Sequence, residues 1–135
     1  FIKIFTAILL CIVEENMFAK FSGIILWTEK ISNLQKFYED LLGLEAHYVN
    51  DKFISFRWKD FKFSIGEHSF ITNKLNKDPY RFMINFNVDE IYSTLNKLKT
   101  KNVEILREPE TEHWGGIVAT FKDPDGNIVQ IFQQP

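Results

Sequence analysis

The sequence predicts an α+β fold made of two paired βαβββ modules, at residues 19–66 and 80–133, whose curled mixed or antiparallel sheets surround a concave groove. One observation behind this prediction is the order of elements, because a strand, a helix and three further strands occur twice, separated by a polar connector. Another is size, because a half of about 50 residues could not bury its own helix and sheet well. The third is composition, since 45% hydrophobic residues suffice for the core of one soluble domain. We expect a ligand site in the groove, because such sites form at module junctions.

The first module opens with an apolar strand and an amphipathic helix. The β-branched and aromatic residues within 19–28 predict the strand. Apolar residues at helical spacing predict a helix over 31–42, namely Ile31, Leu34, Phe37, Tyr38, Leu41 and Leu42. Ser32 or Asn33 can cap this helix, and Gly43 ends it.

Three short strands complete the first module. They are predicted over 44–50, 52–59 and 61–66, with turns at Asn50-Asp51 and Lys59-Asp60. The middle strand alternates between an apolar face and a mixed face. The apolar face carries Ile54, Phe56 and Trp58, and the mixed face carries Phe53, Ser55 and Arg57.

The same pattern restarts after a polar connector over 67–79 that ends in a proline. We predict a strand over 80–88, a helix over 89–101 that Asp89 caps, and a short strand over 103–107. A loop over 108–116 and a hairpin over 117–133 follow.

The hairpin closes on the sequence DPDGN at residues 123–127. Pro124 restricts φ, the aspartates can bond nearby backbone, and Gly126 tolerates positive φ, so this is a turn. The strand after it is apolar except for Gln130, which raises the question of what Gln130 faces.

The start of the chain is set apart from this domain. Residues 1–13 form an apolar run that is too short to span a bilayer, and Met17 stands just before the first strand. We expect residues 1–16 to be an upstream or leader segment and 17–135 to be a single domain of a cytoplasmic protein without membrane attachment. The net charge of −2 gives no footprint for nucleic acid, and the lone Cys11 excludes a disulfide framework within the chain and a cysteine-based zinc site.

Four stretches resemble the vicinal oxygen chelate superfamily, the group of glyoxalase I, bleomycin-resistance proteins and extradiol dioxygenases. They are GIILWTEKISNLQKFYEDLLGLE, FKFSIGEHS, FMINFNVDEIYSTLNKLKTKNVEI and HWGGIVATFKDPDGNIVQIF, which together extend over most of the chain after Met17. The resemblance implies paired βαβββ modules around a U-shaped cavity, and it implies a homodimer. It leaves the chemistry open, because the fold hosts lyases, dioxygenases, thiol transferases and binding proteins.

The resemblance also implies four inward positions that hold a divalent metal in the enzymes of the superfamily. In this sequence they fall on Gly23, Ser64, Met83 and Gln130. Glycine has no ligand atom, serine is a weak ligand, and a thioether does not suit a hard-oxygen metal site. Gln130 occupies the position of a ligand side chain, so we expect it to face the groove. Because the other three positions cannot complete a metal site, we expect no metal or other cofactor.

Other residues keep a second interpretation open. His47, His68 and His113 could build an altered metal site, although none of them has a ligand-spaced motif. Arg57 could anchor an anion if it points inward, or be a solvated charge if it points outward. The predicted ligand-binding residues are Trp27, Phe56, Trp58, Ser64, Met83, His113, Trp114 and Gln130.

Several functions are compatible with these observations. The first is a metal-independent protein that sequesters an aromatic or amphipathic small molecule. The alternative is a metal-dependent glyoxalase-type lyase or isomerase, or a dioxygenase, with an altered ligand set. A thiol transferase requires the metal as well, and a domain that binds only a protein partner is a fourth possibility.

Overall fold

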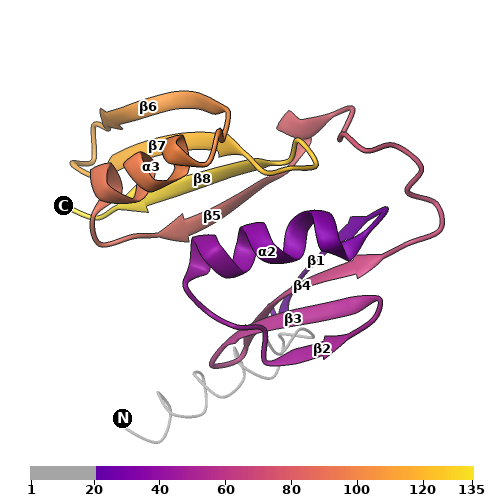
Figure 1. Ribbon diagram of the computed structural model, residues 1–135. Helices are drawn as coiled ribbons and strands as arrows, with labels where there is room; N and C mark the ends of the chain where they lie inside the picture. The colour runs from indigo at the N-terminus through magenta and orange to yellow at the C-terminus, as the bar shows by residue number, and fades with distance from the viewer. Residues whose placement is uncertain (1–20) are drawn as a thin grey trace, which may run out of the picture.

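The computed structural model describes residues 21–135, so the expected leader, Cys11 and Met17 lie outside the described part. Figure 1 shows two sheets, each with its own helix. The first module contains β1 (Gly23–Thr28), α2 (Ile31–Leu42), β2 (Tyr48–Asn50), β3 (Phe53–Trp58) and β4 (Phe61–Glu67). The second contains the 3-10 turn η1 (Pro79–Arg81), β5 (Met83–Asn87), α3 (Ile91–Thr100), β6 (Ile105–Thr111), β7 (Ile117–Lys122) and β8 (Ile128–Gln133). Within residues 21–135, no helix is long and apolar enough to cross a membrane.

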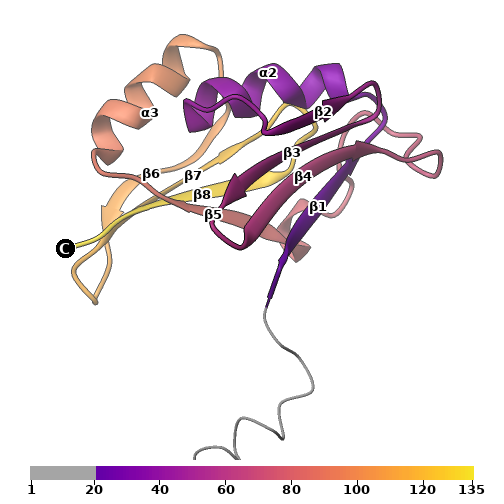
Figure 2. The ribbon, with the colours of Figure 1, turned by 90° about the horizontal axis from the view of Figure 1, so that it is seen from below.

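The two sheets have the same topology, which confirms the predicted repeat and fold class. Their strand orders are β1-β4-β3-β2 and β5-β8-β7-β6. In each sheet the first strand of the module lies parallel to the last, and the other neighbours are antiparallel. Both helices lie on the same side of the two sheets (Figure 2). Each sheet therefore has a helix side and a helix-free side.

The starts of the two helices differ from the prediction. The residues before them are Lys30 and Glu90, and neither cap is made by its side chain, so the caps expected at Ser32 or Asn33 and at Asp89 are wrong. Instead, the Ile31 amide donates to Oε1 of Glu67 at 3.2 Å, and the Ile91 amide donates to Oε1 of Gln133 at 2.8 Å. Glu67 and Gln133 are the last residues of the final strand in their modules. In both modules, therefore, the final strand supplies the side chain that accepts the first amide of the helix.

Several strands have bounds other than those expected. Tyr80 and Arg81, expected to open the strand over 80–88, lie in η1 instead, and the strand itself is Met83–Asn87. β2 is only three residues long, and β6 continues to Thr111 through part of the predicted loop 108–116. Pro109 lies inside β6, which is possible because β6 is the edge strand of its sheet and its pairing with β7 is interrupted by register shifts. Gly43, by contrast, ends α2 in the left-handed region as expected, with φ of 62°.

One hydrophobic core joins the helix sides of both modules. Phe56 and Phe63 stack beneath α2 with ring centroids 6.0 Å apart, and Phe63 also meets Phe86 of the second module at 5.9 Å. Phe37 of α2 lies 6.4 Å from Phe121 of β7. The modules therefore pack through their aromatic helix sides, which leaves the helix-free sides outside the core.

The DPDGN turn ties the second module to the first through buried hydrogen bonds. The Tyr38 hydroxyl donates to Oδ2 of Asp123 at 2.7 Å, and Oγ1 of Thr28 donates to Oδ2 of Asp125 at 2.6 Å. Asp123 also accepts the backbone amides of Asp125 and Asn127 at 2.9 Å through its other oxygen, as the turn chemistry predicts. One carboxylate thus shapes the turn and joins it to α2.

Burial dominates the electrostatics of this junction. It raises the pKa of Asp123 above its usual value, while hydrogen bonds from Tyr38 and Asn127 oppose the shift. It also raises the pKa of Asp125, against the bond from Thr28. Burial raises the pKa of Tyr38 well above its usual value, and the neighbouring Asp123 adds to the effect, so the hydroxyl keeps its proton and remains a donor.

We predict that Tyr38→Phe lowers the free energy of unfolding by about 1–3 kcal/mol, because the buried Asp123 carboxylate loses a donor and water cannot replace it. The measurement is urea denaturation followed by circular dichroism. Tyr92→Phe is the matched control, since Tyr92 is exposed on α3 and its loss should change stability by less than about 0.5 kcal/mol. Equal stability of the two variants would contradict the role of this bond.

Candidate functional site

The candidate site is a cavity of about 660 Å³ on the helix-free side of the first sheet. Its floor comes from alternate residues of β3 and β4, whose other residues face the core. The described residues that line it are Ser22, Gly23, Ile24, Ile25, His47, Tyr48, Phe53, Ser55, Arg57, Asp60, Lys62 and Ser64. All of them belong to the first module, so this cavity is not the groove between the two sheets that the sequence led us to expect.

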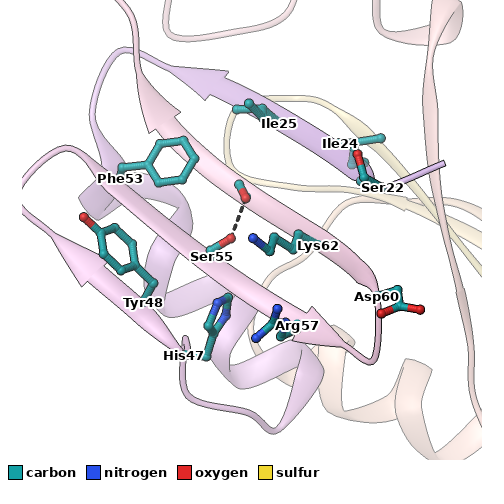
Figure 3. Close-up of a pocket in the computed structure, with 12 residues that line it drawn as sticks. Ser22, Ile24, Ile25, His47, Tyr48, Phe53, Ser55, Arg57, Asp60 and Lys62 are labelled. Carbon is teal, nitrogen blue, oxygen red and sulfur yellow. Dashed lines mark hydrogen bonds between the residues drawn. The ribbon is translucent and has the colours of Figure 1, made fainter. Parts of the chain in front are cut away.

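The cavity has two chemically different ends, as Figure 3 shows. The rings of Tyr48 and Phe53 lie at one end, and the basic side chains of His47, Arg57 and Lys62 gather toward the other. β1 makes one wall of the cavity partly apolar, because Ile25 lines it on the side of Phe53. This arrangement suits a molecule with an aromatic part and a polar or charged part.

Two serines lie in the middle of the floor. Ser55 and Ser64 are direct cross-strand partners, and their hydroxyl oxygens are 2.5 Å apart. One hydroxyl donates to the other, so the accepting serine keeps its own proton for a further acceptor. Both side chains are buried, which makes this pair a fixed polar point between the two ends of the cavity.

Arg57 and Lys62 occupy the next pair along the same two strands, on the same face. Arg57 therefore lines the cavity, where its side chain is also exposed to solvent. Neither side chain forms an ion pair with another residue of the described part. Arg81 is different, because it is bound to Asp78 on the surface at 2.7 Å.

Among the predicted ligand-binding residues of the first module, Ser64 lies in the cavity and Phe56 does not. Phe56 is 1% exposed in the core, so the prediction that it lines a groove is wrong. Trp58 shares its side of β3 but is partly exposed, and it lines a separate cavity of about 420 Å³ formed by both modules, where its ring lies 6.3 Å from Phe86. Trp27 is on the helix-free side next to Phe53 but lines a second cavity of about 350 Å³, beside the connector.

The remaining predicted residues lie in the second module, away from the cavity. Met83 and Gln130 face the helix-free side of the second sheet, which answers the question raised by Gln130: its neighbours there are Asn85 and Thr120. His113 and Trp114 lie in the turn between β6 and β7, where the Trp114 ring packs against Phe132.

The donor set does not fit the metal of the superfamily. At Gly23 even a Cβ atom would come within 2.1 Å of the Lys62 carbonyl oxygen, so no ligand side chain can be placed there. The Ser64 hydroxyl is hydrogen-bonded to that of Ser55, and the Met83 thioether is a poor ligand for a hard metal ion. Nor do three His, Cys, Asp or Glu side chains come together as a metal site anywhere within residues 21–135.

The three histidines are also placed apart. His47 lines the cavity, while His113 lies in the exposed turn before β7. The His68 ring packs edge-on against Trp27, and its Nδ1 accepts the Phe70 amide at 3.1 Å. They do not form the altered metal site that was the alternative interpretation.

The paired βαβββ fold is that of the vicinal oxygen chelate superfamily. The Glyoxalase-like domain family matches residues 21–134, and the chain belongs to this family. In overall structure the chain is similar to a glyoxalase-related enzyme from Fulvimarina pelagi, with a TM-score of 0.70, 17% identity, and coverage of 87% of this chain and 90% of the other.

Shorter stretches match curated relatives. YetH from Bacillus subtilis (strain 168), an uncharacterized protein, is 47% identical over 43 residues, which are 32% of this chain and 35% of YetH. A probable lactoylglutathione lyase from Synechocystis is 36% identical over 47 residues, which are 34% of this chain and 36% of the lyase. The chain thus matches little more than a third of the length of these two relatives.

The sequence contained a signal for the cavity residues that the prediction did not use. In an α+β module the apolar face of a strand packs under the helix, so the mixed face of β3 is the one left for a site. Phe53, Ser55 and Arg57 were visible as that face. The apolar face, with Phe56 and Trp58, was instead assigned to the groove.

We predict that Gly23→Ala destabilises the fold by about 1–3 kcal/mol, because the added Cβ collides with backbone that cannot move away without breaking the β1–β4 pairing. Thermal unfolding of the full chain measures the effect. Gly66→Ala is the comparison, since its Cβ would meet the side chains of Trp27 and Phe53, and the half-exposed Trp27 can turn aside. A Gly66 variant that is as unstable as the Gly23 variant would contradict this account.

Proposed function

We propose that this protein binds and sequesters an aromatic or amphipathic small molecule in the cavity of the first sheet, without a metal. The observation that carries the proposal is the cavity itself, in which rings, a serine pair and basic side chains follow one another along one floor. Its volume of about 660 Å³ lies in the range of small-molecule sites, about 300–1,000 Å³.

The four metal positions support the metal-independent form of this proposal. A glyoxalase-type lyase, an isomerase or a dioxygenase would need several oxygen or nitrogen ligands that converge on one ion. Gly23, Ser64, Met83 and Gln130 provide no such set, and they lie in pairs on different sheets. The match to a probable lactoylglutathione lyase is the reason to test the enzyme alternative directly.

We expect no change in the melting temperature of the full chain when Zn²⁺, Ni²⁺, Mn²⁺ or Fe²⁺ is added, and a rise when an aromatic compound such as 2-naphthamide or 2-naphthoate is added. A ligand that binds only the folded state stabilises it by about 2.7 kcal/mol at a hundredfold excess over its Kd. Elemental analysis before and after chelation checks for bound metal.

A cavity variant makes this test specific. Ile25→Trp fills the space beside Phe53 and should abolish the shift with either compound, whereas Val49→Trp, on an exposed residue outside the cavity, should retain it. A metal-dependent shift together with stoichiometric bound metal would favour the enzyme, and no shift with any aromatic compound would end the proposal.

We further propose that the protein acts as a homodimer in which a second copy covers the cavity. The helix-free side of the second sheet exposes Met83, and the partly exposed Trp114 and Phe132 lie against each other at its far end. In the proposed dimer, Met83 and Gln130 of one copy contribute to the cavity of the other; neither residue lines it within one chain.

The expected mass in solution is therefore twice the 16.0 kDa of the chain. Light scattering coupled to gel filtration measures it. Met83→Lys should shift the population toward monomer, because it places a charge in the proposed contact, while Leu44→Lys on the exposed end of the first module should not. A monomeric wild-type chain at micromolar concentration would overturn this proposal.

A further inference from the structure

Two cations stand side by side on the floor of the cavity. Arg57 and Lys62 are direct antiparallel partners, one residue before and one after the pair that closes the β3–β4 hairpin. They are the same kind of pair as Ser55 and Ser64, two positions along, whose hydroxyl oxygens come within 2.5 Å. The guanidinium and the ammonium are thus anchored on neighbouring backbone positions and face the same space.

This arrangement is unfavourable without an anion. Like charges directly opposite each other destabilise a sheet. Some other basic residues have carboxylate partners: Arg107 binds both Glu110 and Glu112, and Lys99 binds Glu108. Within residues 21–135, Arg57 and Lys62 have no such ion pair.

The surroundings of the pair point to a small anion attached to a larger group. His47 lies beside Arg57 in Figure 3, and among the described lining residues Asp60 is the one that carries a carboxylate. The serine pair lies between the cations and the rings of Tyr48 and Phe53, and it offers a hydroxyl proton. The floor therefore runs from positive charge, through a hydrogen-bond donor, to an aromatic surface.

We propose that Arg57 and Lys62 bind the anionic oxygen group of the ligand, a carboxylate or a phosphate, while its aromatic part lies on Phe53 and Tyr48. This inference rests on the proposed small-molecule binding and specifies its ligand as an aromatic anion. Arginine pairs with such oxygens through two parallel hydrogen bonds, and lysine adds a point charge. The cost of holding two cations together is offset when the anion is bound.

Isothermal titration of the full chain with three naphthalene probes tests the charge. 2-Naphthoate and 2-naphthyl phosphate carry the anion, and 2-naphthamide has the same ring without it. We expect an anionic probe to bind about tenfold or more tightly than the amide, and its affinity to fall as salt is raised, because both cations are exposed to solvent. The tighter of the two anionic probes identifies carboxylate or phosphate as the preferred group.

Charge-removing variants assign the effect to the pair. R57Q and K62Q should each weaken the anionic probe about tenfold and leave the amide unchanged. Without ligand, each should melt at the same temperature as the wild type or above it, because the repulsion between the two cations is relieved. Lys52→Gln is the control, since Lys52 lies in the turn between β2 and β3, outside the cavity.

The outcomes separate this inference from the function on which it rests. If the amide binds as tightly as the anions, or if R57Q and K62Q bind the anions normally, the anion site is wrong while small-molecule binding stands. If none of the three probes binds, the proposed function fails and the anion site with it. Loss of affinity in K52Q to the same degree would show a general charge effect and would also overturn the site.

Discussion

A single buried carboxylate connects the local and the global structure of this protein. Asp123 accepts two backbone amides of its own turn and, through its other oxygen, the Tyr38 hydroxyl from the helix of the other module. Burial raises the pKa of Asp123 and also that of Tyr38, so this bond lies in a place where a missing partner cannot be replaced by water. The same group therefore shapes the turn and links it to the first module, beside the shared core.

The way the modules are joined determines where a site can form. The helix sides of the two sheets are buried in the hydrophobic core, where α2 packs with the rings of Phe56, Phe63 and Phe86. These sides therefore stabilise the fold and are not available to a ligand. The cavity on the helix-free side of the first sheet lies outside this core. This explains how Arg57 and Lys62 can stand next to each other in a domain whose core is strongly apolar.

The sequence predicted those features that depend on near neighbours. The helix over 31–42, the end at Gly43 and the DPDGN turn each follow from residues a few positions apart, and the structure confirms them. The helix starts did not follow, because Glu67 and Gln133 reach them from strands 36 and 42 residues away. The prediction ended β6 at residue 107, because Pro109 indicates a loop. A proline is tolerated in an edge strand, but the sequence does not show that β6 lies at the edge of its sheet.

The site was harder to predict than the fold for a related reason. Aromatic residues suggest both a core and a ligand surface, and only the position of the helix decides between them for Phe53 and Phe56. The superfamily resemblance implied four metal positions, but at Gly23 the Lys62 carbonyl leaves no space for a side chain. The side chain of that same Lys62 stands in the cavity as a cation. A site that has no room for a ligand of a metal cation, and that presents fixed positive charge instead, is chemically suited to anions.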